Sequence, residues 1–159
     1  MKIYVLTLLL FYQASCFAQS KINNELNTIL NKSLLICIND IKHSVGVDSL
    51  NISYFDNLHI SISNYPNDFI FDENIKASNL KFINIYGKSS IKQKKSVNAI
   101  SLVSYVLSGN KLIVHFVDIN ILRKKKNINI STGSGTIFTY EYSCDKKEWG
   151  LIIKKTYGI

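Results

Sequence analysis

A carboxylate and two tyrosines are the residues whose types and spacing could support acid–base chemistry. Asp118 stands within a predicted strand, on the same face as Phe116. Tyr140 and Tyr142 share one face of another predicted strand and could line the same cavity as Asp118. In such a cavity a buried carboxylate acts as a base, and tyrosine hydroxyls stabilise a developing oxyanion. The alternative is an ordinary solvated aspartate, because Asp118 also lies near the end of its strand.

Cys37 and Cys144 could form a disulfide bond. Cys37 lies on the apolar stripe of a predicted helix, and Cys144 shares a strand face with Tyr140 and Tyr142. If the helix packs on that face, both thiols point into one core, and two such thiols can pair in an oxidising compartment. The alternative is two unpaired thiols that pack as small hydrophobic side chains. The spacing leaves both open, because a disulfide requires Cα atoms within about 7 Å of each other.

The remaining candidate motifs predict neither a metal site nor a cofactor. His43, His59 and His115 have no spacing that places two of them on one face of a helix or strand. The glycine-containing segment over residues 132–136 leads into a strand and lacks the lysine of a phosphate-binding loop. We interpret it as a flexible turn or a bulge. The chain has no Cys-x-x-Cys and no Gly-x-Ser-x-Gly motif, so redox chemistry and a serine nucleophile have no support.

The composition indicates a folded domain and argues against a nucleic-acid site. The chain has 159 residues, of which 47% are hydrophobic, too many for a disordered protein. Its formal net charge is +8, but Arg123 is the only arginine among 19 basic residues, and nucleic-acid sites favour arginine. The basic clusters at 92–95 and 123–126 are therefore interpreted as solvated turns. We expect no nucleic acid as a partner.

The first 18 residues have the pattern of a secretory signal peptide. Lys2 precedes an apolar run, and the small side chains of Cys16 and Ala18 predict cleavage after Ala18. The run of about ten residues is too short for a membrane-spanning helix, which needs about 20, and no later segment is apolar enough to span a membrane. We therefore expect an exported mature chain of residues 19–159, periplasmic or secreted. A lipid anchor at Cys16 is less favoured, because Gln13 stands where a bacterial lipobox has leucine.

Positioning these side chains requires one helix followed by strands. Residues 21–45 carry apolar side chains at intervals of three and four, which predicts one amphipathic helix that ends at Gly46. After Gly46 the hydrophobic period changes to two, which is typical of strands. The predicted strands cover residues 58–63, 69–71, 80–86, 98–107, 111–122, 134–144 and 149–157, with hairpin turns at 108–110 and 145–148.

These elements predict a single α+β domain over residues 19–159. The amphipathic helix should lie across one face of a curved antiparallel β-sheet, since neither element can bury its apolar surface alone. Cystatin-like and NTF2-like folds share this order of elements, so the chain resembles them in outline. No diagnostic motif accompanies the resemblance, and a fold of this kind does not fix a function.

Two functions are compatible with these residues. The first, which we favour, is an exported non-catalytic module that binds a protein or another component of the cell envelope. The second is a small cone-shaped pocket enzyme or ligand carrier in which Asp118 acts with Tyr140 and Tyr142. No cofactor is expected for either function. Neither the identity of the partner nor the number of subunits follows from the sequence, and a cavity in the structure would distinguish the two functions.

Overall fold

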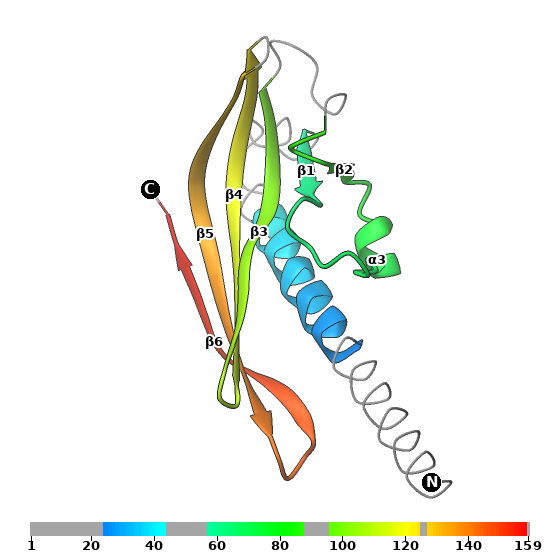
Figure 1. Cartoon of the computed structure of the whole chain (residues 1–159), viewed down its shortest axis with the longest axis vertical. Helices are drawn as coiled ribbons and strands as arrows, with labels where there is room; N and C mark the ends of the chain where they lie inside the picture. Colours follow the sequence, from blue (N-terminus) through cyan, green and yellow to red (C-terminus); the bar gives the residue numbers. More distant parts are fainter. Residues whose placement is uncertain (1–23, 44–56, 88–95, 125–126, 159) are drawn as a thin grey trace, which may run out of the picture.

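The protein forms a mixed six-stranded sheet with helices, an α+β arrangement (Figure 1). The computed structural model describes residues 24–43, 57–87, 96–124 and 127–158. Within these ranges the strand order across the sheet is β2-β1-β3-β4-β5-β6. The strands are β1 (Leu58–Ser61), β2 (Lys81–Ile83), β3 (Ser96–Ser108), β4 (Lys111–Lys124), β5 (Asn127–Ser143) and β6 (Glu148–Tyr157). The helices in the same ranges are a long one over residues 24–43 and the short α3 (Glu73–Lys76).

The 24–43 helix buries the apolar stripe from which it was predicted. Its inward side chains are at most 6% exposed, and they are Ile29, Leu30, Leu34, Cys37 and Ile38. Ser33 is also fully buried, so one hydroxyl lies on the inward face, whereas Lys32 is exposed on the other side. The predicted helix is confirmed over 24–43, and its expected ends at 21–23 and 44–45 lie outside the described residues.

Strands β3 to β6 form an antiparallel meander with the hairpin turns that the sequence predicts. Ser108 pairs with Lys111, so the first hairpin closes through two residues. The first of these is Gly109, whose φ of 61° is a left-handed conformation that favours glycine in a two-residue hairpin loop. A second turn at residues 144–147 joins β5 to β6.

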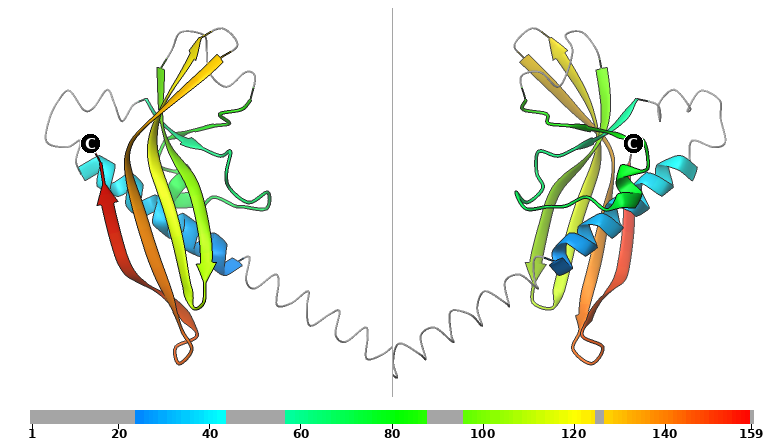
Figure 2. Two further views of the ribbon diagram at one scale, coloured as in Figure 1. Left: turned by 60° about the vertical axis from the view of Figure 1, so that its left-hand side comes forward. Right: turned by 90° about the vertical axis from the view of Figure 1, so that its right-hand side faces the viewer.

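The segment over residues 132–136 forms the irregularity expected of it. On β5, Gly135 pairs with Val117 and Thr132 pairs with Ile119, so two residues of β5 lie opposite the single residue Asp118 of β4. An extra residue of this kind bends the strand and increases its twist. The sheet is strongly twisted where β4 and β5 pass through this region (Figure 2).

The prediction of a wholly antiparallel sheet is wrong at one edge. β1 pairs in parallel with β3 on one side and with β2 on the other. Parallel strands need a connection of about a dozen residues or more, and residues 62–80, which include α3, provide it between β1 and β2. A period of two indicates a strand but carries no information about the direction of its neighbour.

The predicted strand at residues 69–71 is also wrong. Phe69 and Phe71 lie outside regular structure, and their ring centroids are 4.5 Å and 5.1 Å from that of Tyr65. Asp72 then caps α3, because its carboxylate accepts a hydrogen bond from the backbone N–H of Asn74 at 2.8 Å. These aromatic residues therefore pack against one another and do not pair in the sheet.

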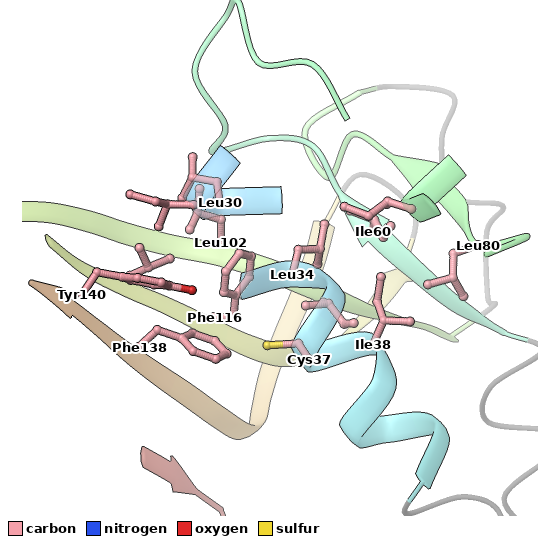
Figure 3. Close-up of a cluster of buried hydrophobic side chains, with 14 of the residues drawn as sticks. Leu30, Leu34, Cys37, Ile38, Ile60, Leu80, Leu102, Phe116, Phe138 and Tyr140 are labelled. Atoms are coloured by element: carbon pink, nitrogen blue, oxygen red, sulfur yellow. The ribbon is translucent and has the colours of Figure 1, made fainter. Parts of the chain in front are cut away.

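The larger hydrophobic cluster contains residues of the long helix and of the sheet (Figure 3). Its central members are Leu30 and Leu34 from the helix, Leu102 from β3, Phe116 from β4, and Phe138 and Tyr140 from β5. A second cluster includes Ala99, Val117 and Ile119. Because successive residues of a strand point to opposite faces, Phe116 and Val117 show that β4 is buried on both of its faces here.

Replacing Leu34 by alanine should lower the free energy of unfolding by about 2–5 kcal/mol, since the change removes a fully buried side chain and leaves a cavity. Lys32→Ala, on the exposed side of the same helix, should change that free energy by less than about 0.5 kcal/mol. Urea denaturation followed by circular dichroism measures both. Equal effects of the two substitutions would contradict the burial of this helix face.

Candidate functional site

Asp118 lies half-buried at the irregularity between β4 and β5. The Ser134 hydroxyl, from one of the two β5 residues that lie opposite Asp118, donates a hydrogen bond to the Asp118 carboxylate. Burial raises the pKa of Asp118, and the hydrogen bond from Ser134 opposes part of that rise. The hydrogen-bond partner of this carboxylate is therefore a serine of the bulge and not a tyrosine.

The two tyrosines of the predicted constellation lie farther along β5. Tyr140 is 1% exposed, and its hydroxyl is 2.8 Å from Ser33 Oγ. Because Ser33 Oγ donates to the Ile29 carbonyl at 2.8 Å, the Tyr140 hydroxyl donates to Ser33. Tyr142 is half-buried, and its ring centroid lies 5.3 Å from that of Trp149.

The structure does not bring Asp118, Tyr140 and Tyr142 together. Ser134, the partner of Asp118, precedes Tyr140 by six residues, and a strand that rises by about 3.3 Å per residue separates them by about 20 Å. Shared chemistry would need groups within hydrogen-bond reach of one ligand. Burial also raises the pKa of Tyr140, and its hydrogen bond with Ser33 identifies it as a structural residue of the core.

The two cysteines among the described residues are free, Cys37 buried and Cys144 exposed. Cys37 hydrogen-bonds with the Thr136 side chain, and burial, with smaller contributions from the charges of Asp118 and Asp40, raises its pKa to about 12. Thr136 precedes Cys144 by eight residues of β5, or about 26 Å of strand. The proposed disulfide is therefore not seen, because a pair needs Cα atoms within about 7 Å.

The histidines are as scattered in the fold as they are in the sequence. His59 Nδ1 lies 2.8 Å from the carbonyl of Asn57, His115 Nε2 contacts the Tyr157 hydroxyl, and His43 is exposed in the last turn of the long helix. Among the described residues, no three His, Cys, Asp or Glu side chains form a group that could hold a metal ion.

An open apolar groove lies between the first turns of the 24–43 helix and the β3–β4 hairpin, and we call it the hairpin groove. The helix contributes Leu26 and Ile29 to it, the hairpin contributes Leu107 and Leu112, and β5 and β6 contribute Tyr142 and Trp149. Its volume is about 760 Å³. Pockets that hold small molecules have volumes of about 300–1,000 Å³, so the hairpin groove has the size of a ligand site.

Strand alternation determines which hairpin side chains face the groove. Leu107 pairs with Leu112 across the hairpin, and Tyr105 pairs with Val114. Tyr105 and Leu107 therefore share the face of β3 that carries the core farther along the strand. Val114 is fully buried, whereas Leu107 is 64% exposed. The apolar face of the sheet thus continues past the part that the core covers, and this uncovered part forms one wall of the groove.

One carboxylate enters the hairpin groove. Trp149 Nε1 donates a hydrogen bond to Glu25 Oε2 at 3.3 Å, which links the first turn of the helix to the start of β6. Among the described residues that line the groove, Glu25 is the only charged one, although the chain as a whole has a net charge of +8. Near the other end of the helix, Lys154 Nζ donates to Asp40 Oδ1 at 2.7 Å.

Sequence reasoning did not single out Glu25, Tyr105, Leu107 or Trp149. The hairpin turn at 108–110 was sufficient to place Leu107 beside Leu112, and Trp149 is the only tryptophan of the chain. The hydrophobic pattern of the sequence does not show where along the sheet the helix lies. That position decides which apolar side chains of a strand face are core residues and which remain accessible.

No known protein offers a comparison for the groove. Comparisons with protein-family models, with curated proteins and with solved structures gave no match. In the part of the chain that the structure describes, no helix has both the length and the hydrophobicity that crossing a membrane requires. Any function must be argued from residues of this chain.

The thiols of Cys37 and Cys144 should differ sharply in reactivity. Cys144 should react with Ellman's reagent in the folded protein, whereas Cys37 should react only after unfolding, because it is buried and its high pKa disfavours the thiolate. Cys144→Ser should abolish the reaction of the folded protein. If the unfolded, unreduced protein shows no reactive thiol, the cysteines are paired and the placement of Cys144 is contradicted.

Proposed function

We propose that this protein is an exported, non-catalytic binding module whose ligand occupies the hairpin groove. The observation that carries the proposal is the groove of about 760 Å³, walled by aliphatic and aromatic side chains. Small-molecule sites are concave and mostly apolar, with a few polar groups that orient the ligand. In the hairpin groove, Glu25 and Asn110 supply such polar groups.

The roles of the candidate catalytic groups favour binding over catalysis. The Tyr140 hydroxyl is engaged with Ser33 in the core, and Asp118 is engaged with Ser134 at the bulge. The alternative function, a pocket enzyme or ligand carrier that uses Asp118 with Tyr140 and Tyr142, needs these groups around one ligand. Of the three, only Tyr142 lines the hairpin groove. Of this alternative, the ligand carrier is therefore still supported, because Tyr142 forms part of the groove wall.

The fold that we propose is cystatin-like or NTF2-like in outline, with the 24–43 helix lying across the curved sheet. The hydrophobic cluster shared by the helix and β3, β4 and β5 supports this arrangement. The hydrogen bonds of Glu25 and Asp40 to β6 support it further. A helix that crosses a curved sheet leaves strand ends uncovered, and the hairpin groove lies at such an end.

Export and the identity of the partner are part of the same proposal. The signal-peptide pattern of residues 1–18 supports a periplasmic or secreted location, and Cys16 is the position at which a lipid would attach in the less favoured anchored form. A binding module in that location would meet components of the cell envelope. We propose such a component as the source of the groove's ligand.

Binding in the groove can be measured through Trp149, the only tryptophan of the chain. The uncharged apolar dye N-phenyl-1-naphthylamine should bind the mature chain and quench Trp149 emission by energy transfer. Leu107→Arg should weaken this binding by about tenfold or more, because it replaces an apolar wall with a charge.

Val106→Arg is the matched control for Leu107→Arg. Val106 is 51% exposed and precedes Leu107 on β3, so its side chain points to the opposite face. The control should bind the dye as the wild type does. Absence of dye binding to the wild type, or equal losses in both variants, would contradict the proposal.

A further inference from the structure

Three aromatic side chains from three different strands line the hairpin groove. They are Tyr105 of β3, Tyr142 of β5 and Trp149 of β6. The rings of Tyr142 and Trp149 are tilted by 59° with centroids 5.3 Å apart, so they do not stack face to face. An aromatic ring attracts a cation placed over its face within about 6 Å, and tryptophan and tyrosine do so more strongly than phenylalanine. The adjacent rings of Tyr142 and Trp149 suit a positively charged ligand, whereas Tyr105 lies level with Phe138, four residues from Tyr142 along the sheet.

The charge of the groove wall points in the same direction. Glu25 is half-buried there and accepts a hydrogen bond from Trp149, so its position is fixed against the aromatic group. No lysine or arginine is among the described lining residues, although the chain has 19 basic and 11 acidic residues. Among the described lining residues the one charged side chain is thus acidic, which is complementary to a cation.

The rest of the groove is aliphatic. Leu26 and Ile29 of the helix and Leu107 and Leu112 of the hairpin line it. These side chains suit an alkyl or other apolar body and cannot satisfy polar groups. The groove therefore offers an apolar part and an aromatic, acidic part within one space of about 760 Å³.

We infer that the hairpin groove selects an apolar small molecule that carries an ammonium group, with the cation held by Tyr142, Trp149 and Glu25. This inference rests on the proposed function and names the chemical class of its ligand. Quaternary and protonated ammonium groups both fit, since both are attracted by aromatic faces and by a carboxylate. The apolar body lies along the aliphatic walls.

The test compares three ligands that share one alkyl chain and differ in the charge of the head group. Decyltrimethylammonium, decanol and decyl sulfate are used below micelle-forming concentrations to displace N-phenyl-1-naphthylamine from the mature chain at physiological salt. The cation should displace the dye at a concentration about tenfold lower than decanol, which is about 1.4 kcal/mol. Decyl sulfate should be the weakest ligand, although the net charge of +8 would favour it without a local effect.

Two variants locate the selectivity in the groove. Glu25→Gln removes the charge and keeps an acceptor for Trp149, and Tyr142→Leu removes one ring and keeps an apolar wall. Each should reduce the preference for the cation over decanol to less than about threefold. Glu148→Gln is the matched control, because Glu148 is exposed and adjacent to Trp149 but does not line the groove.

The outcomes separate this inference from the proposed function. If neither the dye nor any of the three ligands binds, both are overturned. If decanol and the cation bind the wild type equally well, the inference is overturned and the groove remains a binding site. A preference for the cation that persists in both Glu25→Gln and Tyr142→Leu also overturns the inference, since the selectivity then arises elsewhere.

Discussion

Burial of one helix face is the constraint on which the rest of the molecule depends. The 24–43 helix carries a continuous apolar stripe, and such a stripe is stable in water only when another surface covers it. The strand face around Phe116 and Phe138 belongs to the same buried cluster. Because Glu25 and Asp40 of this helix both accept hydrogen bonds from β6, the position of the helix also bears on where the covered part of the sheet stops. The hairpin groove begins at that point.

Packing decides which reactive groups remain available for function. Cys37 and Tyr140 belong to the buried cluster, and burial raises the pKa of each. Two residues beyond Tyr140 on the same strand face, Tyr142 is half-buried and lines the groove with Trp149. One face of β5 is therefore core at Tyr140 and groove wall at Tyr142, and a shift of two residues separates the two environments.

The sequence was sufficient for features that depend on periodicity and local turn chemistry. The helix, the hairpin closed by Gly109 and the irregularity at 132–136 follow from such signals, and the structure has all three. Strand direction and distance do not follow from them. The parallel pairing of β1 depends on the order of the strands in the sheet, which no local sequence pattern specifies. The separation of Asp118 from Tyr140 and the unpaired state of Cys144 depend on how far apart residues lie along the strands. For the same reason the groove was not predicted, although each of its walls lies on a predicted element.

The most direct test of this account is a double-mutant cycle between Ser33 of the helix and Tyr140 of β5, which are 107 residues apart in sequence. Ser33→Ala leaves the buried Tyr140 hydroxyl without its acceptor, which should cost about 1–3 kcal/mol of unfolding free energy. Tyr140→Phe leaves Ser33 bonded to the Ile29 carbonyl and should cost about 0.5–1.5 kcal/mol. The double mutant should be more stable than the sum of these losses predicts, by about 0.5–2 kcal/mol. Additive losses, within about 0.3 kcal/mol, would show that the two residues do not touch and would contradict the position of the helix on the sheet.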